Sequence, residues 1–208
     1  IYTRLDSSAA SDVYKRQAQM DAMADLLDSG EIRAVGVSNF SARAMRRAHE
    51  RLVERGYSLA SNQVKYSLLD RRIETNGVLE AAQKLGASII AYSPLEQGLL
   101  TGKFHDNPDL LRSRQGFRRF MPWFKRDRIL QSRPLIDALR EIGARHGGFT
   151  AAQVALAWLV SFHGSTVVAI PGATKAHHAK ENVGALDLTL EDDDLRQIDE
   201  LSRRYARM

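Results

Sequence analysis

Four groups of polar residues follow short apolar stretches of the sequence, at or just past the point where each stretch ends. They are Ser38-Asn39, Gln63, Tyr92-Ser93 and residues 172–175. Hydroxyl and amide side chains supply both donors and acceptors of hydrogen bonds. If the apolar stretches are parallel strands of a β/α barrel, these groups meet at one rim and predict a single shared pocket. Taken one at a time, each is equally well explained as a turn or a helix cap.

The elements that must position these residues alternate between short β-branched stretches and amphipathic ones, a pattern typical of parallel strands joined by crossover helices. We expect strands at 34–37, 61–66, 87–92 and 166–170, and helices at 42–54, 78–84, 135–144 and 151–160. A capping box of Thr189 and Asp192 predicts a last helix running to about Arg204. The fold class is therefore α/β, and four strands are too few to close a barrel.

Five motifs resemble those of a known family and follow one another in the family's order. They are GVSNF at 36–40, NQVKYSLL at 62–69, AYSPLEQGLLTGK at 91–103, IPGATK at 170–175 and ENVGAL at 181–186. In these motifs the chain resembles the aldo-keto reductase family from about residue 20 to its end. The resemblance implies an α/β fold of the (β/α)8 TIM barrel type. Residues 18–208 would be a partial barrel, the last four β/α units and a C-terminal helix.

The resemblance also implies NADPH or NADP+ as cofactor. Ser38, Asn39 and Gln63 would hydrogen-bond the nicotinamide carboxamide, and Tyr92 would stack on the ring. Ser93, Leu95, Gln97, Gly98 and Lys103 would belong to a loop that crosses the pyrophosphate. Gly172, Thr174, Lys175, His178, Glu181 and Asn182 would surround the adenosine 2′-phosphate and the adenine, where a helix start suits an anion.

Three of these assignments keep alternatives. Ser38 and Asn39 are also suited to cap the helix expected at 42–54, and Lys103 is also explained as an ordinary surface lysine. Many relatives carry Gln or Arg where His178 stands, which leaves the strength of the preference for NADPH over NADH open. The adjacent His177 and His178 do not predict a metal site, because neighbouring helical residues point in different directions.

The activity that the resemblance implies is reduction of aldehydes or ketones to alcohols, with a small-molecule carbonyl substrate. The family's catalytic Asp, Tyr, Lys and His come from the first half of the barrel, which has no counterpart in this sequence. No catalytic residue is therefore assigned, and the 208-residue chain is expected to be an inactive fragment. The alternative function is a non-catalytic NADPH-binding regulatory subunit, because potassium-channel β subunits share this fold and cofactor.

Two further segments are predicted from their composition. The basic, aromatic connection at 104–130 contains Phe117, Phe120 and Trp123, which either contact the substrate or pack the loop against the barrel. Residues 1–17 show no helical or strand period and join a helical pattern near Ala18. We expect this segment to be extraneous to the fold, with a divergent loop or strand as the alternative.

The overall composition excludes several classes of protein. The 208 residues are 44% hydrophobic and 26% charged, as in ordinary soluble domains, and contain no cysteine for disulfides or thiolate metal sites. The net charge of +5 is not accompanied by a nucleic-acid-binding motif, and no apolar stretch is long enough to span a bilayer. We expect a cytoplasmic protein without a nucleic-acid partner or membrane insertion, and make no prediction of its oligomeric state.

Overall fold

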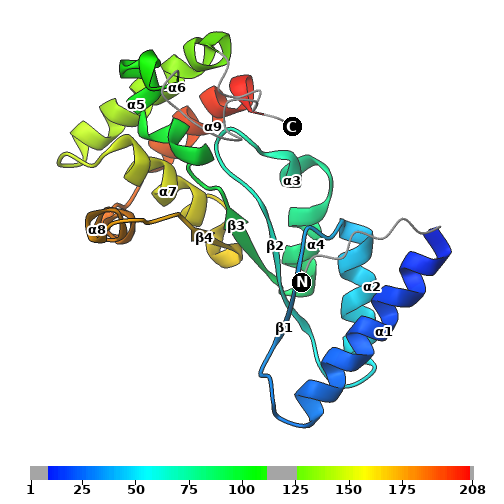
Figure 1. Ribbon diagram of the computed structural model, residues 1–208. Helices are drawn as coiled ribbons and strands as arrows, with labels where there is room; N and C mark the ends of the chain where they lie inside the picture. The colour runs from blue at the N-terminus through cyan, green and yellow to red at the C-terminus, as the bar shows by residue number, and fades with distance from the viewer. Residues whose placement is uncertain (1–8, 112–125, 207–208) are drawn as a thin grey trace.

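The structure is a computed structural model that describes residues 9–111 and 126–206. In this part of the chain four parallel strands form one sheet in the order β1-β2-β3-β4 (Figure 1). The strands are β1 Val35–Ser38, β2 Leu59–Lys65, β3 Ser88–Tyr92 and β4 Val167–Ile170. The predicted α/β class and all four predicted strands are confirmed.

Helices follow or precede each strand, as expected for crossover connections. The α-helices are α1 Ala9–Asp28, α2 Ala42–Val53, α3 Arg72–Thr75, α4 Val78–Leu85, α5 Lys103–Asp106, α6 Arg126–Arg145, α7 Ala151–Ser161, α8 Ala176–Gly184 and α9 Asp192–Tyr205. Short 3₁₀ turns are η1 Glu96–Thr101, η2 Pro108–Leu111, η5 Gly164–Thr166 and η6 Ala185–Asp187. Figure 1 shows α1, α2 and α4 near β1 and β2, with α6 to α9 gathered at the β4 end. None of the helices in the described ranges is long and apolar enough to cross a bilayer.

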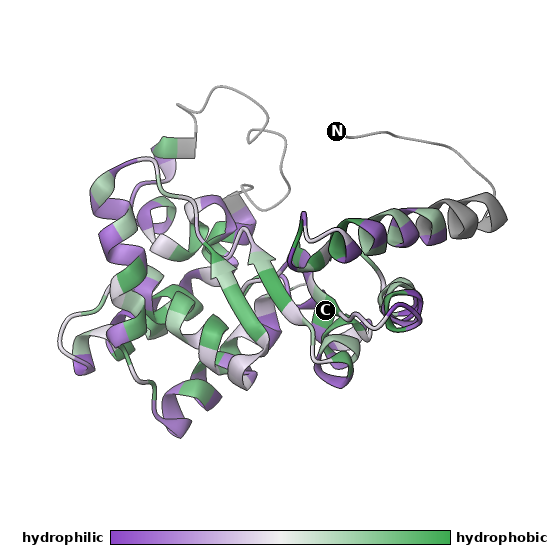
Figure 2. Cartoon of the chain, turned by 90° about the horizontal axis from the view of Figure 1, so that it is seen from below, coloured by the Kyte–Doolittle hydropathy of each residue, from purple (hydrophilic) through white to green (hydrophobic). Residues whose placement is uncertain are grey.

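The sheet buries one face against helices and leaves the other partly open. Leu59, Val64, Ile89 and Ala91 are buried beneath α2, α4 and α7, where the apolar core lies. The strand arrows that can be made out in Figure 2 are coloured mainly as apolar, whereas the helices carry polar and apolar residues on different sides. Residues that alternate with the buried ones are half-buried in β2 and β3. Since all the strands are parallel, their carboxyl ends lie along one edge of the sheet.

Helix α1 begins earlier than the sequence predicted. It starts at Ala9 rather than near Ala18. Its later turns pack on α2 through the buried Met20 and Ala24, and Asp21 accepts a 2.6 Å bond from Arg51 Nε. The prediction required an apolar period, but a helix that is already nucleated extends without one, because each further residue adds a backbone hydrogen bond. Whether residues 1–17 belong to the fold stays a prediction.

The start of α9 also differs from the prediction. The predicted capping box of Thr189 and Asp192 is wrong, because the observed box pairs Glu191 with Asp194, two residues later. Asp194 is selected by tertiary partners: its carboxylate accepts bonds from Arg145 at 2.7 Å and pairs with His146 Nε2 at 2.6 Å. The acidic residue that completes the box is therefore the one that also reaches Arg145 and His146.

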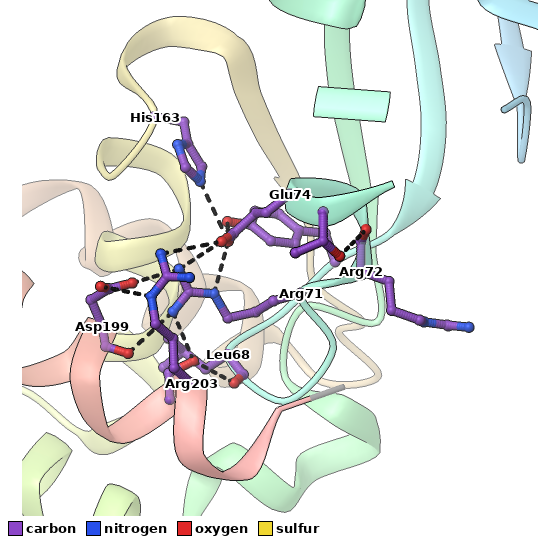
Figure 3. A network of polar contacts seen from close by, with 10 residues as sticks. Leu68, Arg71, Arg72, Glu74, His163, Asp199 and Arg203 are labelled. Carbon is purple, nitrogen blue, oxygen red and sulfur yellow. Dashed lines mark hydrogen bonds and ion pairs between the residues drawn. The ribbon is translucent and has the colours of Figure 1, made fainter. Parts of the chain in front are cut away.

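A buried ionic network joins α9 to the turn that follows β2 (Figure 3). Arg71, at the start of α3, is fully buried and donates two 2.8 Å bonds to the carboxylate of Glu74 and one of 2.6 Å to Asp199. Its guanidinium also lies 4.8 Å from the centre of the Trp158 ring. Ser202 donates a 2.7 Å bond to the carbonyl of Leu68. The C-terminal helix is therefore fixed to the carboxyl end of the sheet.

We expect His105 to make stability depend on pH. His105 is buried, with Nε2 3.0 Å from Ser132 Oγ, and burial together with the charge of Arg133 lowers its pKa. A base with a lowered folded pKa stabilises the fold above its unfolded pKa of about 6.5 and loses that contribution as pH falls. Urea unfolding should therefore show that the free energy of unfolding falls more between pH 7.5 and pH 5.0 in wild type than in His105→Gln. An equal fall in both proteins would show that His105 does not cause the pH dependence.

Candidate functional site

The first part of the site is a hydrogen-bonded cluster at the carboxyl ends of β1, β2 and β3. Ser38 Oγ donates to the carbonyl of Gln63 at 3.1 Å, and Asn39 Nδ2 donates to Ser38 Oγ at 3.1 Å. Tyr92 OH donates to Asn39 Oδ1 at 3.2 Å. The four residues predicted to contact a nicotinamide therefore lie together, although 53 positions separate Asn39 from Tyr92. Ser38 and Asn39 do not cap α2, whose cap is Ser41.

Strained backbone marks the same region. In the described ranges, the non-glycine residues with positive φ are Asn39, Ser93, Glu96 and Gln97, with values from 46° to 57°. One follows β1 and three lie in the loop after β3. Left-handed conformation is tolerated by Asn but costly for Ser, Glu and Gln, and such residues tend to occur at functional sites. These loops are thus held in defined shapes.

The second part is a cavity of about 480 Å³ between the loop after β3 and the segment after β4. Ten of the predicted residues line it: Ser93, Leu95, Gln97, Gly98, Lys103, Gly172, Thr174, His178, Glu181 and Asn182. The two segments are brought together because β3 and β4 are neighbouring parallel strands. The volume lies within the usual range of ligand pockets, and hydroxyl, amide and ammonium groups make it suited to a polar anion.

Lys175 is the predicted residue outside both parts. It is exposed at the N-terminal cap of α8, and its carbonyl accepts the backbone N–H of His178 at 3.0 Å. Its neighbour Thr174 lines the cavity, with Oγ1 3.4 Å from His178 Nδ1. Lys175 thus stands at the rim, at the positive end of the α8 dipole.

Glu181 has a structural partner in addition to its place in the cavity wall. Its carboxylate accepts a 2.9 Å bond from Thr150 Oγ1, and its carbonyl accepts one of 3.2 Å from Gln153 Nε2. Thr150 and Gln153 form the capping box of α7. Glu181 therefore positions α8 against α7 and sets one wall of the cavity.

Some lining residues were missed by the sequence analysis. Pro94, Thr101, Ala152 and Ile170 also line the cavity. Thr101 lies within the motif at 91–103 and was recognisable from it, whereas Ala152 comes from α7 and has no sequence signal. Phe117, Phe120 and Trp123, predicted to contact substrate or pack the loop, lie outside the described residues.

A charged cluster beside the loop after β3, with its two carboxylates buried, was also missed. Glu96 Oε1 lies 2.9 Å from Lys65 Nζ and accepts a 3.0 Å bond from Ser67 Oγ. Asp70 accepts two 2.7 Å bonds from Arg72 and lies 3.6 Å from Lys65 Nζ. Burial raises the pKa of Glu96, and Lys65 and Ser67 oppose this shift. We call these five residues the Glu96 cluster.

Comparison with known proteins agrees with this geometry. The sequence model of the Aldo/keto reductase family matches residues 6–203. The chain is 36% identical over 183 residues to aldo-keto reductase str7 of Strobilurus tenacellus, covering 87% of this chain and 52% of that protein. It is 31% identical over 183 residues to aldo-keto reductase yakc [NADP(+)] of Schizosaccharomyces pombe, covering 87% of this chain and 51% of that protein. The chain thus spans about half the length of these curated relatives.

A solved structure shares the fold as well. The crystal structure of the thermostable aldo-keto reductase Tm1743 in complex with the inhibitor epalrestat superposes with a TM-score of 0.65 at 30% sequence identity. The match covers 89% of this chain and 54% of that one. With the sheet order, the polar cluster and the family match in agreement, this chain belongs to the aldo/keto reductase family of oxidoreductases.

Proposed function

We propose that this chain is the NADP(H)-binding part of an oxidoreductase that reduces aldehydes or ketones to alcohols. The observation that carries the proposal is the joining of two distant segments into one cavity. Residues 93–103 and 172–182 are far apart in sequence, yet all of their predicted cofactor contacts except Lys175 line the same cavity. The four β/α units would form the later half of a barrel whose rim is this site.

The residues present fit NADP(H) by chemistry. The polar cluster at Ser38, Asn39 and Gln63 offers donors and acceptors for a carboxamide, and the half-buried Tyr92 offers a ring face beside it. An added Cβ on Gly98 would lie 3.0 Å from Lys103 Nζ, so the lysine amine lies against the backbone that would face the pyrophosphate. When bound, the cofactor supplies a hydride, and these residues bind and orient it.

Calorimetric titration of the 208-residue chain tests the proposal. We expect saturable binding of NADPH and a raised melting temperature in its presence. The same chain with NADPH and 4-nitrobenzaldehyde should show no NADPH oxidation above background, because no proton donor is assigned in its sequence. A cooperatively melting chain that binds no NADPH would contradict the proposed cofactor, and turnover would require a donor among these residues.

A glycine pair provides a matched control for the position of the site. Gly98 and Gly56 have φ of 91° and 82°, so alanine at either costs about 1–2 kcal/mol of backbone strain. Gly98 lines the cavity, whereas Gly56 lies in the turn between α2 and β2. Gly98→Ala should weaken NADPH binding, both through its backbone and by displacing Lys103 Nζ, which the added Cβ would meet at 3.0 Å. Gly56→Ala carries the same backbone strain, and its Cβ meets nothing within 4 Å, so it should not weaken binding. If the two variants bound NADPH with equal affinity, the cofactor would not bind in this cavity.

A further inference from the structure

The Glu96 cluster lies beside the loop of residues 93–103 but does not line the cavity that the loop encloses. Ser67 and Asp70 are fully buried, and Glu96 is 3% exposed. Two carboxylates are therefore held away from water at the end of β2, which is unfavourable unless their charges are compensated. Arg72 compensates Asp70 and Lys65 compensates Glu96.

The loop that Glu96 belongs to has an unfavourable backbone. Ser93, Glu96 and Gln97 all adopt left-handed φ, of 53°, 46° and 57°. Such residues keep this conformation only where surrounding contacts impose it. The side chain of Gln97 donates to Ser93 Oγ at 3.3 Å, within the loop itself. Glu96 is the member of the three whose side chain bonds to another element of the fold, through Lys65 and Ser67.

Its partners lie on a rigid support. Lys65 is the last residue of β2 and pairs in register with Tyr92, the last residue of β3. Ser67 is fixed by reciprocal backbone bonds with Asp70, both of 3.1 Å, and its hydroxyl also accepts the N–H of Asp70. The Glu96 carboxylate is therefore tied to the sheet by two contacts of 3.0 Å or less.

We infer that Glu96 is a positioning residue that holds the loop of residues 93–103 in its ligand-binding shape before the cofactor arrives. Glu96 does not contact the cofactor in this account. It acts through the backbone of Gln97 and Gly98, which line the cavity. The inference rests on the proposed function, because that function assigns the cavity to NADP(H).

The effect on NADPH binding depends on the fraction of molecules in which the loop has its ligand-binding shape, which we call the competent fraction. Glu96→Ala removes both contacts to the sheet while keeping a residue that disfavours left-handed φ. If the competent fraction falls to about one tenth, the measured NADPH dissociation constant rises about tenfold. Glu96→Gln keeps an acceptor oxygen for Ser67 and Lys65, so it should restore most of the affinity.

A purely electrostatic role predicts a different result. If Glu96 acted only by its negative charge, both Ala and Gln would leave Lys65 with Asp70, at 3.6 Å, as its carboxylate partner in the cluster and would tighten the binding of an anionic cofactor. Calorimetric titration with NADPH therefore separates the two accounts. Dissociation constants in the order wild type, Gln, Ala, from tightest to weakest, support positioning. Tighter binding by either variant overturns it, as does unchanged binding by Glu96→Ala.

Hydrogen exchange of the free protein gives an independent readout. Glu96→Ala should speed amide exchange in residues 93–103 more than in the core strands, whereas Glu80→Ala, a change in an exposed pair with Lys84, should not. Uniformly faster exchange would overturn the inference in favour of general destabilisation. If wild type binds no NADPH, the proposed function fails alone, and loop-specific exchange still decides whether Glu96 holds the loop.

Discussion

Replacing Arg71 with alanine is expected to lower the free energy of unfolding by about 3–5 kcal/mol, the cost of breaking a buried ion pair by removing one partner. The guanidinium is fully buried and bonded to Glu74 and Asp199. Burial raises the pKa of Glu74, but His163, Arg71 and Tyr66 more than offset it and lower the value to about 2. The carboxylate therefore stays ionised at neutral pH and would be left buried without its main partner.

Arg203 provides the matched control for this change. It belongs to the same network, with Nε 3.0 Å from Asp199 Oδ2 and NH2 3.8 Å from Glu74 Oε2, but its side chain is 48% exposed. Solvent screens such pairs, so Arg203→Ala should cost about 1 kcal/mol or less. Urea unfolding at pH 7 measures both variants. Equal losses would mean that water compensates Glu74 when Arg71 is removed.

A double variant separates the charge from the packing. Arg71→Met with Glu74→Leu removes both buried charges and keeps much of the apolar volume beside Trp158. Replacing a whole buried pair with apolar residues is often neutral, so this variant should recover much of the stability lost in Arg71→Ala. A double variant no more stable than Arg71→Ala would show that Tyr66 and Asp199 depend on these charges.

Strands β1, β3 and β4 could be predicted from the sequence because each is a short stretch with two or more β-branched residues between turns. Strand β2 has one, Val64, and its position followed from the alternation of strands and helices. The main errors concern positions where the local pattern is weak. Helix α6 begins at Arg126 rather than Leu135, with Pro134 inside it. A proline usually indicates a first turn or the end of a helix. Here the first turns are held by tertiary contacts, including the buried Ile129.

The candidate site was predictable where its residues lie in contiguous motifs at strand ends. The supporting charges were not, because their partners are distant in sequence. Ser67 and Glu96 are 29 positions apart, and Arg71 and Asp199 are 128 apart. A lone arginine or glutamate after a strand carries no signal of burial, since such residues are usually solvated. Only the three-dimensional arrangement reveals that they fix the turn after β2 and the loop after β3.

Lys175 is expected to discriminate between NADPH and NADH. Lys175→Ala is expected to raise the NADPH dissociation constant tenfold or more and to leave that of NADH nearly unchanged. A phosphate monoester carries nearly two negative charges at pH 7, and its charge-assisted bond to a lysine contributes roughly 1.5–3 kcal/mol. About 1.4 kcal/mol corresponds to tenfold. NADH offers the same lysine only a hydroxyl.

Lys175 is exposed at the N-cap position of α8. Thr174 and His178 at the same helix start line the cavity, and the first turn of α8 adds partial positive charge. Lys180 is the matched control, because it is also an exposed lysine of this segment but lies inside α8, away from the helix start where Lys175 stands beside Thr174. Lys180→Ala should change neither dissociation constant by more than about twofold, since exposed charges at a distance are screened by salt. Calorimetric titration of both variants with both cofactors decides the matter. If Lys175→Ala weakened NADPH and NADH equally, or no more than Lys180→Ala did, the 2′-phosphate would not bind at this loop.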